Sequence, residues 1–143
     1  MPDPADVQTA NAGATIGRAE TGDSITFTFT GAVPPSLVLA GWSGGATAVT
    51  VYLNHAGATT LLSVQDSGGS TLPALGSVDL GAHYSTGTDV TFTNSTMTAS
   101  GSTITVVLGT AVGSPKTVSV PTTMSWTASG NSVNESGLPD VEF

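Results

Sequence analysis

The chain has 143 residues, of which only 8% are charged, and its ten acidic residues against just two basic ones, Arg18 and Lys116, give a net charge of −8. A protein that binds nucleic acid or an anionic membrane surface needs rows of cations, so the sequence predicts neither partner. The absence of cysteine excludes disulfide bonds, cysteine nucleophiles and cysteine-based zinc sites. A chain of this length can bury a core without them.

The first 22 residues are polar and rich in glycine, alanine and aspartate. They predict an extended N-terminal arm over residues 1–22, ahead of one β-sandwich domain over residues 23–143. The same stretch lacks the basic and apolar regions of a secretory signal peptide. We therefore expect a protein that acts where it is made, or a piece cut from a longer exported chain.

Alternation of apolar and hydroxyl-bearing residues predicts the first strands. Residues 25–30 alternate strictly, and Pro34-Pro35 ends the pattern. A second alternating segment covers residues 47–53 and leads into a turn at residues 54–57. The apolar run at residues 61–64 then predicts the returning strand of a hairpin.

The second half of the chain continues in short apolar segments separated by turn residues. Strands are expected around residues 78–80, 90–92, 103–108, 118–120, 124–127 and 133. Roughly eight or nine strands at intervals of about 8–12 residues are typical of an all-β, antiparallel two-sheet β-sandwich. No segment carries an apolar period of 3.6 residues long enough to predict a helix.

Scattered motifs also carry a family resemblance. They occupy Gly22–Phe29, Pro35–Trp42, Ser100–Gly109, Met124–Thr127 and Asn134–Phe143. These stretches resemble bacterial immunoglobulin-like domains found in surface proteins of high-GC Gram-positive bacteria and in virion proteins of their phages. The resemblance implies an immunoglobulin-like sandwich. It implies no catalytic residues, because this fold hosts many roles.

One short motif is also found in hydrolases. Residues 41–45 match G-x-S-x-G, which in hydrolases places the serine on a turn between a strand and a helix. No helix is predicted beside Ser43, so we favour a plain glycine-rich turn. His55 and His83 are the only possible bases, and they could also pair as metal ligands. Without a third ligand near them, solvated histidines in turns are the preferred interpretation.

Acidic residues could instead form a calcium site. The candidates are Asp23, Asp66, Asp79, Asp89, Glu135, Asp140 and Glu142. No calcium-binding loop pattern is present, so such a site would require two or three of them to converge at one end of the sandwich. We favour roles in solubility and in protecting turns and edges. The sequence assigns no catalytic, cofactor-binding or metal-binding residue, and no cofactor is expected.

The two tryptophans, Trp42 and Trp126, are expected in the core, with an exposed anchor as the alternative. The threonine-rich strand faces could bind carbohydrate, but they are equally typical of the wet faces of a sandwich.

These observations predict a non-enzymatic structural protein of a phage virion, such as a capsid decoration protein or a small tail or head accessory protein. It would dock on capsid or tail subunits, or on sister subunits as a homo-oligomer, through its arm and one sheet surface. Deletion of residues 1–20 is expected to leave the fold intact and to abolish assembly. The alternative is an immunoglobulin-like spacer or adhesive domain on a bacterial cell surface, which could bind carbohydrate.

Overall fold

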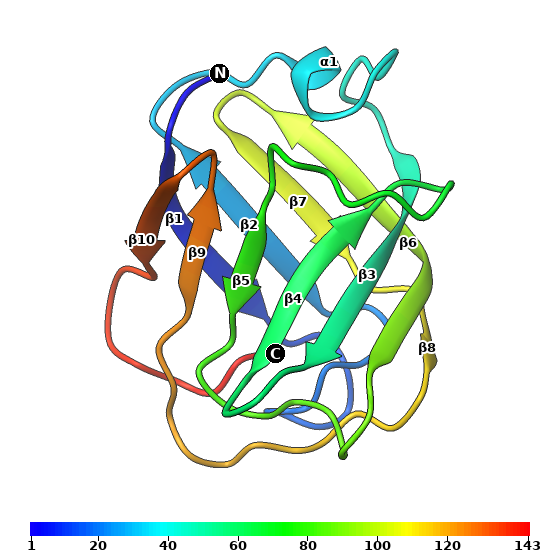
Figure 1. Ribbon diagram of the computed structural model, residues 1–143, viewed down its shortest axis with the longest axis vertical. Coiled ribbons are helices and arrows are strands. Elements are labelled where there is room, and N and C mark those ends of the chain that lie inside the picture. Colours follow the sequence, from blue (N-terminus) through cyan, green and yellow to red (C-terminus); the bar gives the residue numbers. More distant parts are fainter.

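Ten strands and one short helix make up the computed structural model, which describes residues 1–143 (Figure 1). The strands are β1 (Pro4–Ala10), β2 (Ser24–Phe29), β3 (Thr47–His55), β4 (Thr60–Gln65), β5 (Ser77–Asp79), β6 (Val90–Ser100), β7 (Thr103–Val107), β8 (Thr110–Val112), β9 (Ser125–Ala128) and β10 (Asn131–Asn134). The helix α1 (Pro35–Val38) is a single turn that starts at the expected proline break. The structure contains no helix with the length and apolar character needed to cross a membrane.

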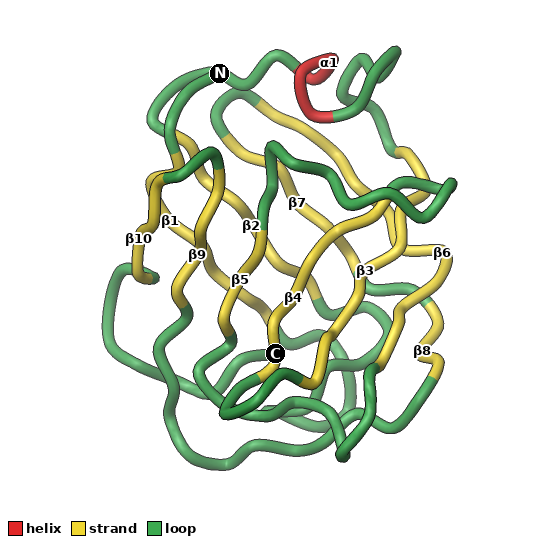
Figure 2. The backbone as a smooth tube through the Cα atoms, in the orientation of Figure 1, coloured by secondary structure: helices red, strands yellow, loops and turns green.

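All strand pairs are antiparallel, and they form one continuous sheet in the order β1-β2-β7-β6-β3-β4-β5-β9-β10. The short strand β8 pairs with β6 outside this path. The two ends of the sheet meet, because β1 lies against β9 and β10 (Figure 2). The result is a nearly closed barrel, in which β3, β4, β5 and β9 pass in front of β1, β2 and β7 (Figure 1).

The sheet turns its corner at a bulge in β6. The register of β3 against β6 shifts between Val49 and Val51, which leaves an irregularity at Thr93 and Asn94. Asn94 has φ 55°, a left-handed conformation that asparagine tolerates better than most residues. A bulge of this kind bends a strand and increases its twist. One long strand therefore serves both layers, and the two sheets expected from the sequence are joined into one.

The core is built from the inward residues of the alternating segments. Trp126 is fully buried and packs edge-on against Phe27 and Phe29, with ring centroids 5.1 and 5.0 Å away. Its indole N–H donates to the Leu75 carbonyl at 2.7 Å. Trp42 is also buried, so the structure confirms the core prediction for both tryptophans.

The N-terminal segment differs from the free arm that was expected. Pro4–Ala10 forms β1 and pairs with β2 along its length. Val7 and Ala19 are fully buried in the common core. One buried valine among polar neighbours gives β1 no visible alternation, so its place in the sheet depends on the partner strand. Because residues 1–22 contribute to the core, the prediction that their loss leaves the fold intact no longer follows.

Two further segments depart from the expected pattern. Val118 and Val120 lie in an irregular segment rather than a strand. The strand β8 was not expected, because all three of its residues are exposed and give no alternation. The strand expected at residues 90–92 is longer than predicted and extends through Met97 to Ser100 as β6.

Candidate functional site

One regular surface is the outer face of β2, β7 and β6, which we call the hydroxyl face. Its side chains are Ser24, Thr26 and Thr28 on β2, Thr103, Thr105 and Val107 on β7, and Thr96, Thr98 and Ser100 on β6. All but Val107 carry a hydroxyl group. The registers place them in rows across the three strands, such as Thr26 beside Thr105 and Thr105 beside Thr98.

The hydroxyl face carries no charged side chain, although the protein as a whole has a net charge of −8. It also carries no aromatic side chain, because every aromatic residue except Tyr52 is buried. A sugar ring would find no flat apolar ring to stack on here.

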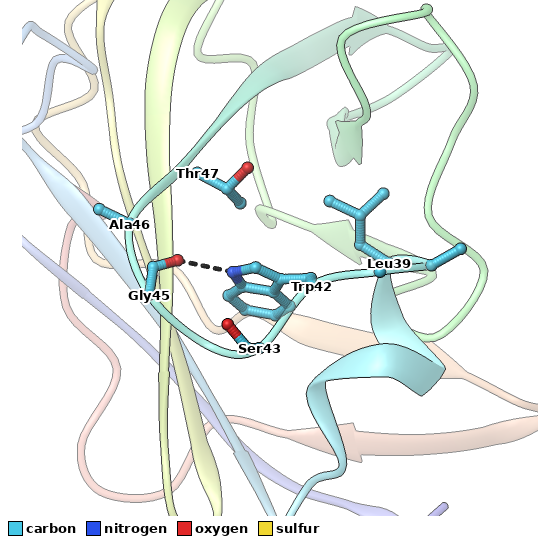
Figure 3. A pocket seen from close by; sticks show the side chains of 8 residues that line it. Leu39, Trp42, Ser43, Gly45, Ala46 and Thr47 are labelled. Carbon is cyan, nitrogen blue, oxygen red and sulfur yellow. Dashed lines mark hydrogen bonds between the residues drawn. The ribbon is translucent and has the colours of Figure 1, made fainter.

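A shallow hollow of about 280 Å³ lies in the loop between α1 and β3 (Figure 3). Trp42 forms its floor, and the indole N–H donates to the Gly45 carbonyl at 2.6 Å. Ser43 and Leu39 line the hollow beside it. The lining offers no ionisable group, so the hollow has no acid, base or metal ligand with which to act on a substrate.

The structure keeps the G-x-S-x-G serine away from both histidines. Ser43 is exposed in a turn before β3 begins, whereas His55 is the last residue of β3. A strand of this length separates its ends by roughly 25 Å. Ser43 therefore has no base, and the interpretation as a glycine-rich turn agrees with its position.

The two histidines do come together, which the sequence interpretation as separate solvated residues did not anticipate. Their rings stack with centroids 3.8 Å apart. The Nδ1 atom of His55 lies 3.0 Å from the hydroxyl oxygen of Ser85. Ser85 is buried, however, and neither it nor His55 lines any of the three hollows in the surface. This histidine–serine contact therefore lacks the cleft that a nucleophilic serine needs to reach a substrate.

Three of the seven candidate carboxylates converge. Oxygen atoms of Glu135, Asp140 and Glu142 lie within 4.8 Å of one another. Glu135 and Glu142 are buried and Asp140 is exposed. An acidic trio of this kind does not by itself assign a metal, and no cation site is assigned to it.

Hydrogen-bond donors from the surrounding protein occupy the two buried carboxyl groups. Glu142 accepts from the hydroxyl groups of Thr9 at 2.8 Å and Thr122 at 3.1 Å. Glu135 accepts from the backbone N–H of Met124 at 2.9 Å. Burial raises the pKa of Glu142 to about 8, and the neighbouring Glu135 charge adds to that rise. Burial also raises the pKa of Glu135, with Asp140 and Asp6 contributing in the same direction.

The other four candidate carboxylates shape loops. Asp23 is fully buried and accepts from the backbone N–H groups of Ala12, Gly13 and Glu20. Asp66 and Asp79 accept backbone N–H groups in the turns that follow β4 and β5. Asp89 accepts from the Tyr52 hydroxyl and the His55 backbone, and these two bonds lower the pKa of Asp89. All four fit the predicted role in protecting turns.

Several residues at the acidic cluster went unnoticed in the sequence. Thr9, Tyr84 and Ser136 lie far apart along the chain, so only the closure of the barrel reveals their contacts. Asp6 on β1 is held by the same closure. Partial burial raises the pKa of Asp6, but the hydrogen bonds that its carboxylate accepts from Ser136 and Gln8 outweigh burial and lower that pKa.

No family model, curated protein or solved structure matches the chain.

Proposed function

We propose that the protein is a non-enzymatic structural protein of a phage particle, a capsid decoration protein or a small tail or head accessory protein. The proposal rests on the hydroxyl face. The buried centres of protein interfaces are depleted in charged residues, because a charge must lose its water when the surfaces meet. On a chain with a net charge of −8, an uncharged sheet face is a surface that a partner can approach at a low desolvation cost.

The occupant that we propose is a protein surface of the particle, with sister copies of this chain arranged beside it. Because β1 is paired within the sheet, the hydroxyl face replaces the free arm as the proposed docking surface. The sequence resemblance supports an immunoglobulin-like assignment for the module, and its strands β2 and β9 coincide with two of the resembling stretches. The proposed location is the virion.

Charged substitutions at the centre of the hydroxyl face test this proposal. The double variant Thr98→Lys and Thr105→Lys would place two uncompensated charges in the interface. We expect binding to purified particles to fall at least tenfold, while far-UV circular dichroism stays unchanged. Thr88→Lys, an exposed substitution in the loop before β6, is the matched control and should bind like the wild type.

Light scattering after size exclusion would report self-association of the same three proteins. Wild-type binding by the double variant would contradict the proposed surface. Binding of the wild type to intact bacterial cells, and not to particles, would instead support a spacer or adhesive domain at a cell surface.

A further inference from the structure

The inference concerns the segment that closes the barrel, residues 135–143, which we call the strap. It begins at the seam where β1 meets β9 and β10, and its backbone is then held at several points by residues outside these three strands. Asp140 pairs with Thr122 through two backbone hydrogen bonds of 2.6 and 3.2 Å. The Glu142 N–H donates to the Tyr84 hydroxyl at 2.7 Å, and the Phe143 carbonyl accepts from the Gly17 N–H at 3.0 Å. The strap therefore joins distant parts of the chain.

Side chains complete the closure where backbone pairing ends. The Asp6 carboxylate accepts from the Ser136 N–H at 2.7 Å, and the Gln8 amide donates to the Ser136 carbonyl at 2.9 Å. The Thr9 hydroxyl links the strap to β1 twice, because it donates to Glu142 and accepts from the Phe143 N–H. Phe143 is buried and packs edge-on against Tyr84.

The centre of this closure is electrostatically unusual. Glu142 is fully buried, and one of its carboxyl oxygens lies within 4.8 Å of a carboxyl oxygen of Glu135. Asp140 on the strap and Asp6 on β1 add negative charge, and Tyr84 is the remaining titratable group that faces the pair. Arg18, one of only two basic residues, donates to the Thr117 hydroxyl instead. Two buried carboxylates so close together cannot both ionise without a large cost.

We propose that Glu135 and Glu142 form a pH-sensitive latch: while the buried pair keeps one proton the strap stays closed against β1, and ionisation of both carboxyl groups releases the strap from the seam. The proton keeps the buried pair at a single negative charge. Its removal puts a second negative charge into a site that already faces Asp6 and Asp140. The Tyr84 hydroxyl does not supply a replacement proton, because burial raises the pKa of that hydroxyl and keeps it protonated.

The direction of the pH dependence follows from where the proton sits. The pKa of Glu142 is about 8 in the folded protein, against an ordinary value of 4.5. Between these two values the folded protein binds a proton that the unfolded chain lacks, so stability falls as pH rises through this window. A difference of one proton raises the unfolding equilibrium constant by up to about tenfold per pH unit.

Urea unfolding at half-unit steps between pH 5 and pH 9 tests the latch. For the wild type, we expect the unfolding equilibrium constant to increase by at least tenfold between pH 5.5 and pH 7.5. Glu142→Gln removes the titrating group and should flatten the profile. Glu20→Gln is the matched control, because Glu20 is the only glutamate outside the latch, and it should keep the wild-type slope.

A second measurement needs no substitution. The carboxyl ¹³C shifts of Glu135 and Glu142 in the full chain should show apparent titration of the pair above pH 6, together with a shift in the Gly17 and Phe143 amide signals. Titration of both carboxyls near pH 4.5, or a wild-type slope that survives Glu142→Gln, would overturn the latch. So would stabilisation by millimolar calcium at pH 8 that Glu142→Gln abolishes, since a cation would then take the place of the proton.

Discussion

Asp23 shows how a single residue organises a loop that lacks regular structure. One carboxylate oxygen accepts from the N–H groups of Ala12 and Gly13, and the other accepts from Glu20. Its own backbone carbonyl accepts from the Leu108 N–H. The loop between β1 and β2 is therefore folded around one buried side chain. The preceding Gly22 has φ 95°, which brings the chain into this position without strain on a side chain.

Replacing Asp23 with alanine should destabilise the fold markedly. The change would leave three backbone N–H groups without their acceptor in a partly buried loop, at a cost on the order of 3 kcal/mol. The free energy of unfolding from urea titrations measures the effect. Asp66→Ala is the matched control, since Asp66 serves an exposed turn where water can take over its two bonds. Equal losses in both variants would contradict the anchoring role of Asp23.

Among the elements, strands with a clear alternation could be predicted from the sequence. The patterns at β2, β3 and β4 place every second residue in the core, and their observed bounds lie within a few residues of the predicted ones. The short strands β1 and β8 were missed, since neither has more than two buried residues to mark one face. The bulge in β6 was missed as well, because it depends on a contact distant in sequence, in which the Gly109 N–H donates to the Ser95 hydroxyl oxygen.

The candidate sites were harder to predict than the strands. The acidic cluster joins Asp6 on β1 to Glu135 and Ser136 near the other end of the chain, and only the closed sheet order brings them together. Likewise, His55 and His83 stack because the β3–β4 hairpin lies against the segment after β5. Local patterns say nothing about such pairings. The hydroxyl face is different, because the alternation that predicts the core also predicts which residues point outward.

The strand β1 provides a test at the level of one element. Deleting residues 1–10 would remove the buried Val7, the ladder to β2 and the Thr9 contacts with the strap. We expect the truncated chain to show no cooperative thermal unfolding transition when its circular dichroism is followed on heating from 25 °C. Removing only Met1 and Pro2, which precede β1, should leave the transition close to that of the full chain. An unchanged transition after the larger deletion would restore the interpretation of this segment as a dispensable arm.

At the scale of the whole molecule, charge is distributed unevenly. Ten acidic residues face two basic ones, and Asp6, Glu135, Asp140 and Glu142 gather at the seam. The hydroxyl face on β2, β7 and β6 carries none of them. Repulsion among the carboxylates therefore opposes closure of the barrel at one place while it leaves the proposed docking surface neutral.

This distribution predicts how the fold responds to salt. Raising sodium chloride from about 10 mM to 500 mM shortens the screening length from roughly 30 Å to a few ångströms, which weakens repulsion between separated carboxylates. We expect the urea midpoint of the wild type to rise with salt, and to rise more at pH 8 than at pH 6. Glu142, whose pKa is about 8, carries its charge in the folded protein mainly above neutral pH, so the repulsion that salt can relieve is larger there. Glu142→Gln should show the same salt response at both pH values. A midpoint that falls with salt would mean that attractive pairs, rather than repulsion at the seam, dominate the electrostatics of this fold.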